Sequence, residues 1–248
     1  MKDSFFQNYS RKHVHFYGEA VSTLLELGLA LVCRVIKKPS VVDLGCGDGR
    51  LIFALCEKGL LKNAGEIVGV DISESRIEHL TREIPFVKGI ISDALNVKEL
   101  SDSSFDFVIC SQLVEHVKND DGLLLEIKRL VKRRGLVYIS SVIKKQYGVY
   151  PYFKNGSFRL DPTHVREYSS ADEFVGLITS KGFEVIEVET RQVMFPLLDL
   201  VIRLFFKIGL LEPYVRFYQQ HEMFSKIRRL RMPVVGYGII EVLARKIE

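Results

Sequence analysis

The sequence predicts an α/β fold in which a mostly parallel sheet is covered by helices on both faces. Between Val41 and Val142, short apolar runs of strand length alternate with segments whose apolar residues recur at helical spacing. The stretch VVDLGCGDGR, residues 41–50, places a glycine-rich turn between a buried strand and a helix start. Two further strand-like runs, 183–193 and 235–244, complete the pattern.

Size and composition are those of one compact unit. A chain of 248 residues can bury one substantial core, so residues 1–248 are expected to form a single domain. The net charge of +4 is mildly basic and indicates no class of partner if it is evenly spread. The four cysteines lack metal-ligand spacing, so reduced thiols and no metal site are expected. The sequence shows neither a secretory signal nor a membrane-spanning run, which predicts a cytoplasmic protein.

The first half of the chain alternates regularly. An N-terminal segment, 1–38, is predicted to contain a helix over Val21–Ile36. A second helix is predicted over Arg50–Lys58, and a third begins after Ser73, whose hydroxyl suits an N-cap. The strands expected in this half are 41–43, 66–70 and 86–91. Strands separated by helices in this way pair in parallel.

The second half begins with the run FDFVIC, 105–110, which is apolar enough to predict a strand buried on both faces. A helix is predicted to begin at Asp120 and to carry the basic run 132–134 in its last turn, with Gly135 just after the cap. A strand at 136–142 follows.

Two long connections interrupt the pattern. Residues 144–169 exceed the roughly 12–15 residues usual for a structureless loop, which is typical of a functional segment. Ser170 and Glu173 then predict a capping box that starts the last helix. Residues 194–233 combine basic and aromatic side chains, which suits a cap over a pocket, a dimer contact or a helix resting on anionic lipid.

Residues 41–50 carry the first chemical signal. Gly45, Gly47 and Gly49 remove side chains where the backbone must turn or approach a ligand, and the following helix offers free N–H groups to an anion. Their G-x-G-x-G spacing departs from the dinucleotide fingerprint. Asp71, at the end of the next predicted strand, is an acceptor suited to a ribose diol. A nucleoside-containing ligand is therefore predicted.

The motif VVDLGCGDGR resembles motif I of the class I S-adenosylmethionine (SAM)-dependent methyltransferases. A second stretch, SFDFVICSQLVEHVKND at 104–121, resembles the motif IV region of a subgroup that includes ubiquinone-biosynthesis enzymes. The resemblance extends from about Val41 to Val142, without the N-P-P-Y or Pro-Cys signatures of base methyltransferases. It implies a Rossmann-like sheet of seven mostly parallel strands, in which the terminal strands form a hairpin and the last strand is antiparallel.

The resemblance implies SAM as cofactor and assigns its contacts to three segments. Asp43 and the backbone of 45–47 meet the methionine end, Asp71 meets the ribose, and ISDALN at 91–96 meets the adenine. The implied cofactor-binding residues are Asp43, Gly45, Cys46, Gly47, Asp71, Ile72, Asp93, Ala94 and Cys110.

Two histidines are candidates for catalysis. His116, within QLVEHV, could accept a proton from a hydroxyl as it is methylated, because imidazole titrates near neutrality. Its alternative role is to shape the pocket. His164 is a candidate second base or substrate ligand, or else it pins its loop by bonding to Asp161 or backbone. Glu115 is a weaker candidate for orienting the substrate.

These observations lead us to expect a SAM-dependent methyltransferase with a small-molecule or lipid-like acceptor and a preference for oxygen. An RNA or protein methyltransferase and a catalytically silent SAM-binding partner subunit are the alternatives. Nucleic acid is disfavoured because no RNA-binding module is recognisable. The insertions 144–169 and 194–233 are expected to cap the substrate, and Tyr9 or Tyr17 to face the cofactor. Peripheral membrane contact or homodimerisation through 194–233 stays open.

Overall fold

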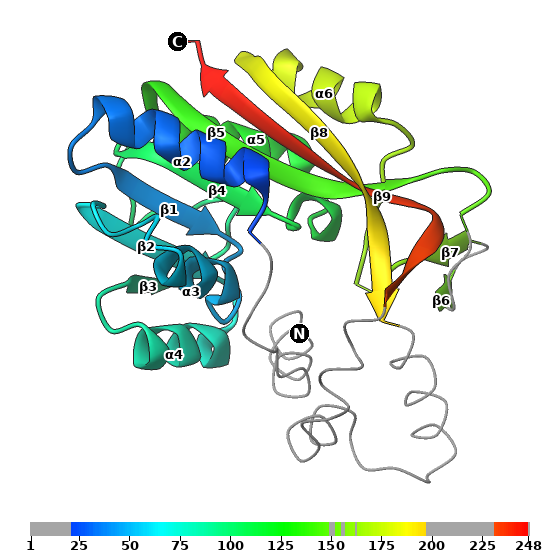
Figure 1. Cartoon of the computed structure of the whole chain (residues 1–248), viewed down its shortest axis with the longest axis horizontal. Coiled ribbons are helices and arrows are strands. Elements are labelled where there is room, and N and C mark those ends of the chain that lie inside the picture. Colours follow the sequence, from blue (N-terminus) through cyan, green and yellow to red (C-terminus); the bar gives the residue numbers. More distant parts are fainter. Residues whose placement is uncertain (1–20, 149–151, 155–156, 162, 197–230, 248) are drawn as a thin grey trace, which may run out of the picture.

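Seven strands form one mixed sheet that organises the described part of the molecule (Figure 1). The computed structural model describes residues 21–148, 152–154, 157–161, 163–196 and 231–247. The strand order across the sheet is β3-β2-β1-β4-β5-β9-β8. These strands are β1 (Ser40–Leu44), β2 (Glu66–Asp71), β3 (Lys88–Ile91), β4 (Phe105–Ser111), β5 (Val131–Lys144), β8 (Phe183–Pro196) and β9 (Arg231–Lys246).

The first five strands are parallel, and the last two form an antiparallel hairpin. β1 lies between β2 and β4, with Val42 opposite Val68 and Val108. β9 lies between β5 and β8 and is antiparallel to both. The predicted Rossmann-like sheet, with its last strand antiparallel, is therefore confirmed.

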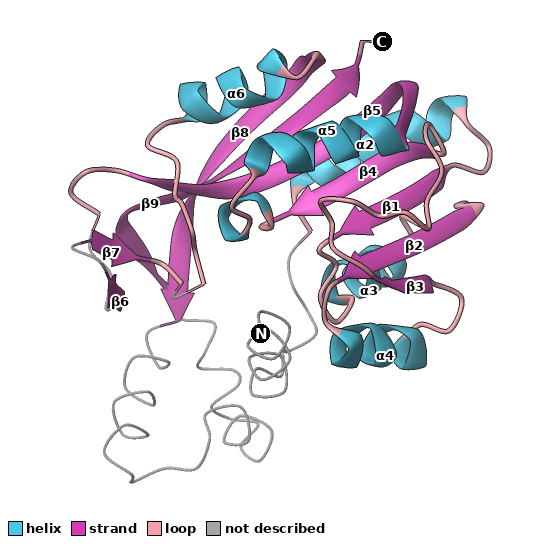
Figure 2. Cartoon of the chain, turned by 180° about the vertical axis from the view of Figure 1, so that it is seen from behind, coloured by secondary structure: helices cyan, strands magenta, loops and turns pink. Residues whose placement is uncertain are grey.

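Helices cover both faces of the sheet, as predicted (Figures 1 and 2). They are α2 (Thr23–Val35), α3 (Arg50–Glu57), α4 (Glu74–Glu83), α5 (Asp120–Leu130) and α6 (Ala171–Ser180), with a short 3-10 helix, η1 (Val114–His116). On one face, Leu25 of α2, Leu55 of α3 and Leu80 of α4 share a buried cluster. On the other face, Ile127 of α5 and Phe174 of α6 lie in a second cluster. Each face thus has its own apolar core.

The end of α5 differs from the prediction. Val131 is already extended and fully buried in β5, so the helix ends before the basic run begins. The left-handed residue is Arg134, with φ of 62°, and not Gly135. Lys132 pairs with the Asp106 carboxylate, 2.9 Å from its Nζ, instead of stabilising the C-terminal end of α5. Burial of the Val131 side chain in the sheet therefore ends the helix earlier than the basic run and Gly135 predicted.

The connection between β5 and α6 contains a small hairpin of β6 (Tyr152–Lys154) and β7 (Ser157–Arg159), separate from the main sheet. At the start of α6, Ser170 Oγ accepts the Glu173 N–H at 3.2 Å, as predicted. The Glu173 carboxylate accepts the N–H of Ser169 at 2.7 Å. The second hydrogen bond of the capping box therefore goes to the residue before Ser170 and not to Ser170 itself.

Some expectations concern residues outside the described ones. These are the roles of Tyr9 and Tyr17 and almost all of the segment 194–233. Within the described residues, no helix combines the length and the apolar character needed to cross a membrane.

The carboxyl ends of three neighbouring strands meet at one edge of the sheet. β1 leads into Gly45, β2 ends at Asp71, and β4 leads into η1. Ligands of open α/β sheets bind at this edge, because the strand order reverses there and the connecting loops diverge.

Candidate functional site

The turn between β1 and α3 depends on glycine. Gly45 and Gly47 have φ of 76° and 58°, a region that disfavours side chains. A Cβ on Gly45 would lie 2.9 Å from Leu113 Cδ1, so the turn packs directly on the segment after β4. The N–H groups of Gly45 and Cys46 donate to the Val70 carbonyl at 2.8 and 3.0 Å. The turn is thereby fixed against the end of β2.

Asp71 joins this turn to α4. Its Oδ2 accepts the N–H of Gly47 at 3.0 Å, and its Oδ1 accepts the N–H of Ser73 at 2.9 Å. Burial raises the pKa of Asp71, although the nearby Arg76 and these two hydrogen bonds oppose the rise. Each carboxylate oxygen keeps a second lone pair, so the side chain can also accept hydrogen bonds from a ribose diol.

Asp43 is the unsatisfied acid of the same edge. Its side chain is buried on β1, and no hydrogen bond from the described residues holds its charge. Burial, with a smaller contribution from Asp71, raises the pKa of Asp43 to about 8. A cationic ligand group would relieve both effects, because it stabilises the carboxylate that burial disfavours.

Arg76 is a residue that the sequence did not single out. A Cβ on Gly47 would be 3.5 Å from its Nη1, which places the guanidinium at the glycine turn. Its Nε is buried without a hydrogen-bond partner among the described residues. The charge of Arg76 lowers the pKa of both Asp71 and His116. No motif marks an arginine in the first turns of a helix, so only the tertiary structure reveals it.

The remaining predicted cofactor residues differ in exposure. Ile72 is half-buried, and Asp93 is exposed, with its Oδ1 accepting the N–H of Leu95 at 3.0 Å. Ala94 is buried. Cys46 Sγ packs against Gly69 of β2, and Cys110 is fully buried in the core. Both cysteines are therefore buried, and the Cys46 backbone is already bonded to Val70 and Gly49.

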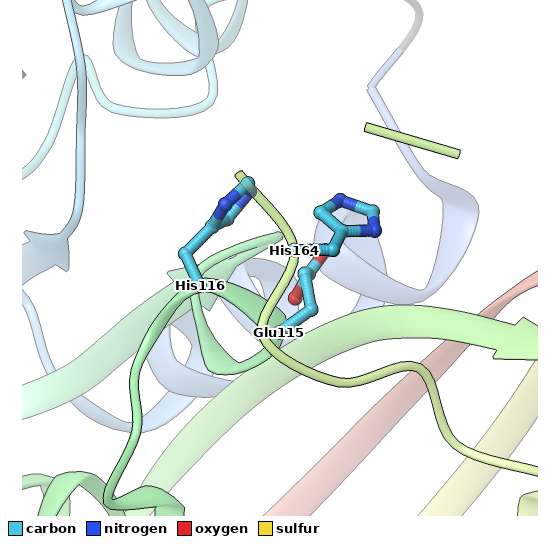
Figure 3. Close-up of side chains that lie close together, drawn as sticks. All are labelled: Glu115, His116 and His164. Carbon is cyan, nitrogen blue, oxygen red and sulfur yellow. The ribbon is translucent and has the colours of Figure 1, made fainter. Parts of the chain in front are cut away.

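Glu115, His116 and His164 form a compact cluster beside this turn (Figure 3). Their potential ligand atoms all lie within 4.8 Å of one another. The two imidazole rings meet edge to face, with centroids 4.8 Å apart. The structure thus joins the two candidate histidines and adds the neighbouring carboxylate.

The loop that carries His164 is held against η1 by main-chain and side-chain bonds. The N–H of Val165 donates to the Glu115 carbonyl at 2.8 Å. Arg166 bonds to the Lys118 carbonyl at 2.6 Å and to the Asp120 carboxylate. These contacts bring His164 to the end of β4 from a distant part of the sequence.

Hydrogen bonds assign the same tautomer to both histidines. His116 Nδ1 lies 2.9 Å from Thr163 Oγ1, and this hydroxyl itself donates to Asp161. His164 Nδ1 lies 2.8 Å from the Glu167 carboxylate. In the neutral form of each ring, Nδ1 therefore carries the proton and Nε2 keeps a lone pair. The main-chain N–H of His164 also donates to the Asp161 carbonyl at 3.2 Å, so the alternative in which His164 pins its loop stays open beside a role in catalysis.

Glu115 is fully buried and only half satisfied. Its Oε2 accepts from Ser141 Oγ at 2.9 Å, whereas its Oε1 has no partner in the described structure. Burial is the main reason that the pKa of Glu115 rises to about 7. Burial and the adjacent His164 lower the pKa of His116 to about 4, so this imidazole is neutral at pH 7.

The cluster adjoins the glycine turn, because Leu113, directly before η1, packs on Gly45. The charge of Arg76 lowers the pKa of both Asp71 and His116. The residues fit SAM: a buried acid lacks a cation, a second acid can accept a diol, and the turn that joins them has two glycines. The cluster presents further acceptor atoms beside these residues.

Comparison with known proteins identifies the family to which the chain is similar. Residues 37–175, more than half of the chain, match a family described as a methyltransferase domain. A ubiquinone biosynthesis O-methyltransferase from Neisseria meningitidis is 30% identical over 109 residues, which cover 42% of this chain and 44% of the relative. The chain therefore spans less than half the length of that relative.

Two solved structures share the fold at low identity. A SAM-dependent methyltransferase from Archaeoglobus fulgidus has a TM-score of 0.53 and 22% identity, over 98% of this chain and 99% of that one. The [4+2]-cyclase SpnF has a TM-score of 0.60 and 19% identity, over 94% and 86% of the two chains. The cyclase shows that this fold also carries other reactions, so the assignment depends on the sequence match. On that match, the chain belongs to the methyltransferase domain family.

Proposed function

We propose that the protein is a SAM-dependent methyltransferase that methylates an oxygen of a small-molecule or lipid-like acceptor. Family membership supports methyl transfer, and the name of the relatives, ubiquinone biosynthesis O-methyltransferase, supports an oxygen acceptor. The observation that carries the proposal is the adjacency, at one sheet edge, of the glycine turn with its acids Asp43 and Asp71 and the Glu115–His116–His164 cluster.

The first group of residues holds the cofactor. SAM supplies a methyl group on a sulfonium centre, poised for in-line displacement. Asp43 is proposed to bind the amino group of the methionine end, and the backbone of 45–47 lies along that end. Asp71 accepts from the ribose, while Ile72 and the segment 93–94 contact the adenine. A buried carboxylate with a raised pKa suits the first role, because the ammonium group restores its charge.

The second group acts on the acceptor. Nε2 of His116 and of His164 can each accept a hydrogen bond from an acceptor hydroxyl, since both Nδ1 atoms are engaged elsewhere. With its pKa lowered to about 4, His116 is a weak base. Its proposed contribution is therefore to orient the hydroxyl.

Cofactor use and the atom that is methylated are tested separately. Isothermal titration calorimetry of the purified chain with S-adenosylhomocysteine is expected to show one binding site, and no binding would refute the proposal. Transfer from tritiated SAM to a panel of catechols, phenols and aliphatic alcohols is expected, with no transfer to the matching amines. Labelling of RNA or protein instead, or binding without any transfer, would select one of the alternatives.

Substrate recognition is proposed to involve the segments 144–169 and 194–233 as caps within a single domain. In the first segment, the described loop 163–168 already closes over η1, since Val165 and Arg166 bond to η1 and to the start of α5. Acceptors of different length, assayed with loop variants, test this role through KM.

A further inference from the structure

Glu115, His116 and His164 each bring one potential metal-ligand atom into the cluster. One carboxylate oxygen, Glu115 Oε1, is buried without a hydrogen-bond partner among the described residues. Such an unpaired buried oxygen is costly. A cation placed among the three side chains removes this penalty.

The surroundings of the two histidines are those of metal ligands. Imidazoles that bind metals usually donate their other N–H to a carboxylate or a polar relay, which fixes the tautomer and increases basicity. His164 donates directly to Glu167, and His116 donates through Thr163 to Asp161. Two independent carboxylate relays thus hold Nε2 of both rings in the metal-binding form.

The spacing and type of the donor atoms also suit a metal. Ligand atoms about 2.1 Å from a zinc ion are roughly 3.4 Å apart in a tetrahedron. One potential ligand atom from each of the three residues lies within 4.8 Å of the other two, so shifts of about an ångström complete the geometry. Two imidazoles and one carboxylate fit Zn²⁺, Mn²⁺ or Fe²⁺ and leave positions open for exogenous ligands.

We propose that Glu115, His116 and His164 form a binding site for one divalent transition-metal ion. No cysteine takes part, which explains why cysteine spacing in the sequence predicted no metal. The histidines then act as ligands and not as bases. The ion fills the space among the three side chains beside the glycine turn.

The role of the ion rests on the proposed function. The acceptor hydroxyl binds an open coordination position, which lowers its pKa, and its proton passes to water. The oxygen then bonds to the methyl carbon while the carbon–sulfur bond breaks and its electron pair stays on sulfur. The ion keeps its charge throughout, so no oxidant or reductant is needed.

Metal binding is tested without any assay of methyl transfer. The full chain is treated with a chelator, dialysed and titrated with Zn²⁺ and with Mn²⁺ by calorimetry. One ion per chain is expected for at least one of the two metals. Glu115→Gln and His164→Asn are expected to weaken its binding at least 100-fold, because each removes one of only three ligands. Glu167→Gln, which keeps the hydrogen bond but loses the carboxylate, is expected to weaken binding about 10-fold.

The controls separate a lost ligand from a lost fold. His79→Asn changes a histidine on α4 that is not one of the three proposed ligands, and this variant is expected to bind the ion as the parent chain does. S-adenosylhomocysteine binding and thermal melting of each variant report whether the fold persists. No ion binding by the parent chain, or unchanged binding by both Glu115→Gln and His164→Asn, would overturn the proposal. If S-adenosylhomocysteine fails to bind while the ion binds, the proposed function falls and the metal site stands.

Discussion

Two buried carboxylates at the same sheet edge are treated differently by the fold. The two oxygens of Asp71 accept backbone N–H groups of Gly47 and Ser73, so the chain itself completes this site. Glu115 accepts from Ser141 through one oxygen, and its second oxygen is buried without a hydrogen-bond partner among the described residues. A buried carboxylate whose two oxygens both accept hydrogen bonds from the chain stabilises the local structure. A buried carboxylate oxygen without a hydrogen bond indicates a place for an external partner.

The first prediction is that Asp71 contributes more to cofactor binding than the exposed Asp93 does. Asp71→Ala removes the diol acceptor together with the anchor of the glycine turn, so S-adenosylhomocysteine should bind about 100-fold more weakly, as expected for two charge-assisted hydrogen bonds. Asp93→Ala is the matched control. Its side chain is exposed and bonds only to Leu95, so a loss of about fivefold or less is expected. Calorimetry measures both, and equal losses would contradict the distinction.

A second prediction concerns the close packing at Gly49, where the glycine turn meets α3. Gly49 has φ of 82°, and a Cβ there would lie 2.3 Å from Leu80 Cδ1. Gly49→Ala should therefore lower the free energy of unfolding by about 2–3 kcal/mol, from backbone strain and overpacking. Gly176, on the exposed side of α6, meets nothing within 4 Å. Gly176→Ala should raise stability by about 0.5–1 kcal/mol. Urea unfolding of both variants checks the contrast, which a destabilised Gly176→Ala would refute.

The third prediction concerns Asp43→Asn, which should make the ligand-free protein more stable and should weaken the binding of S-adenosylhomocysteine. The folded chain holds the proton of Asp43 up to about pH 8, while the unfolded chain releases it near pH 4. The ligand-free protein therefore loses stability as the pH rises between these values. Asn cannot ionise, so Asp43→Asn should be more stable than the parent by about 1–2 kcal/mol at pH 8 and nearly equal at pH 4.

The same variant should bind S-adenosylhomocysteine about tenfold more weakly, because it no longer offers a charge to the ammonium group. Thermal melting at the two pH values measures the stability difference, and calorimetry measures the binding. A variant that is destabilised at pH 8 would show that Asp43 has an internal partner and does not wait for a ligand.

The smallest expected effect is at a third acid, Asp106, away from the site. Burial would raise its pKa, but hydrogen bonds from Ser40 and Lys132 reverse the effect and lower it. A lowered pKa contributes stability above about pH 4, and that contribution disappears as the pH falls through the folded value. Lys132→Met should cost about 0.5 kcal/mol at pH 7, because Lys132 is partly exposed, and less at pH 3. Equal losses at both pH values, measured by urea unfolding, would refute this assignment.

The sequence predicted those parts of the site that depend on local order. A buried strand, a glycine turn and the acid at the end of the next strand are fixed by short segments, so the turn and Asp71 could be placed without a structure. The parallel pairing of the first five strands also followed, because strands linked by helices pair in parallel, and the family resemblance implied the terminal hairpin.

The parts that it missed depend on contacts between distant segments. His164 meets Glu115 because Val165 bonds to the Glu115 carbonyl, and no pattern in either segment encodes that contact. The relays through Thr163 and Glu167 likewise need the folded loop. At the end of α5, strong local signals predicted the wrong boundary, since burial of Val131 in the sheet decided it.

The hairpin of β8 and β9 has a consequence for how such a protein can diversify. Pro196 pairs with Arg231, so the chain leaves the sheet and rejoins it at the two ends of a single rung. The entropy of closing a connection changes only slowly with its length, so the number of residues between these two positions can change with little cost to the sheet. Insertions and deletions at this point therefore leave the edge built on β1, β2 and β4 unchanged.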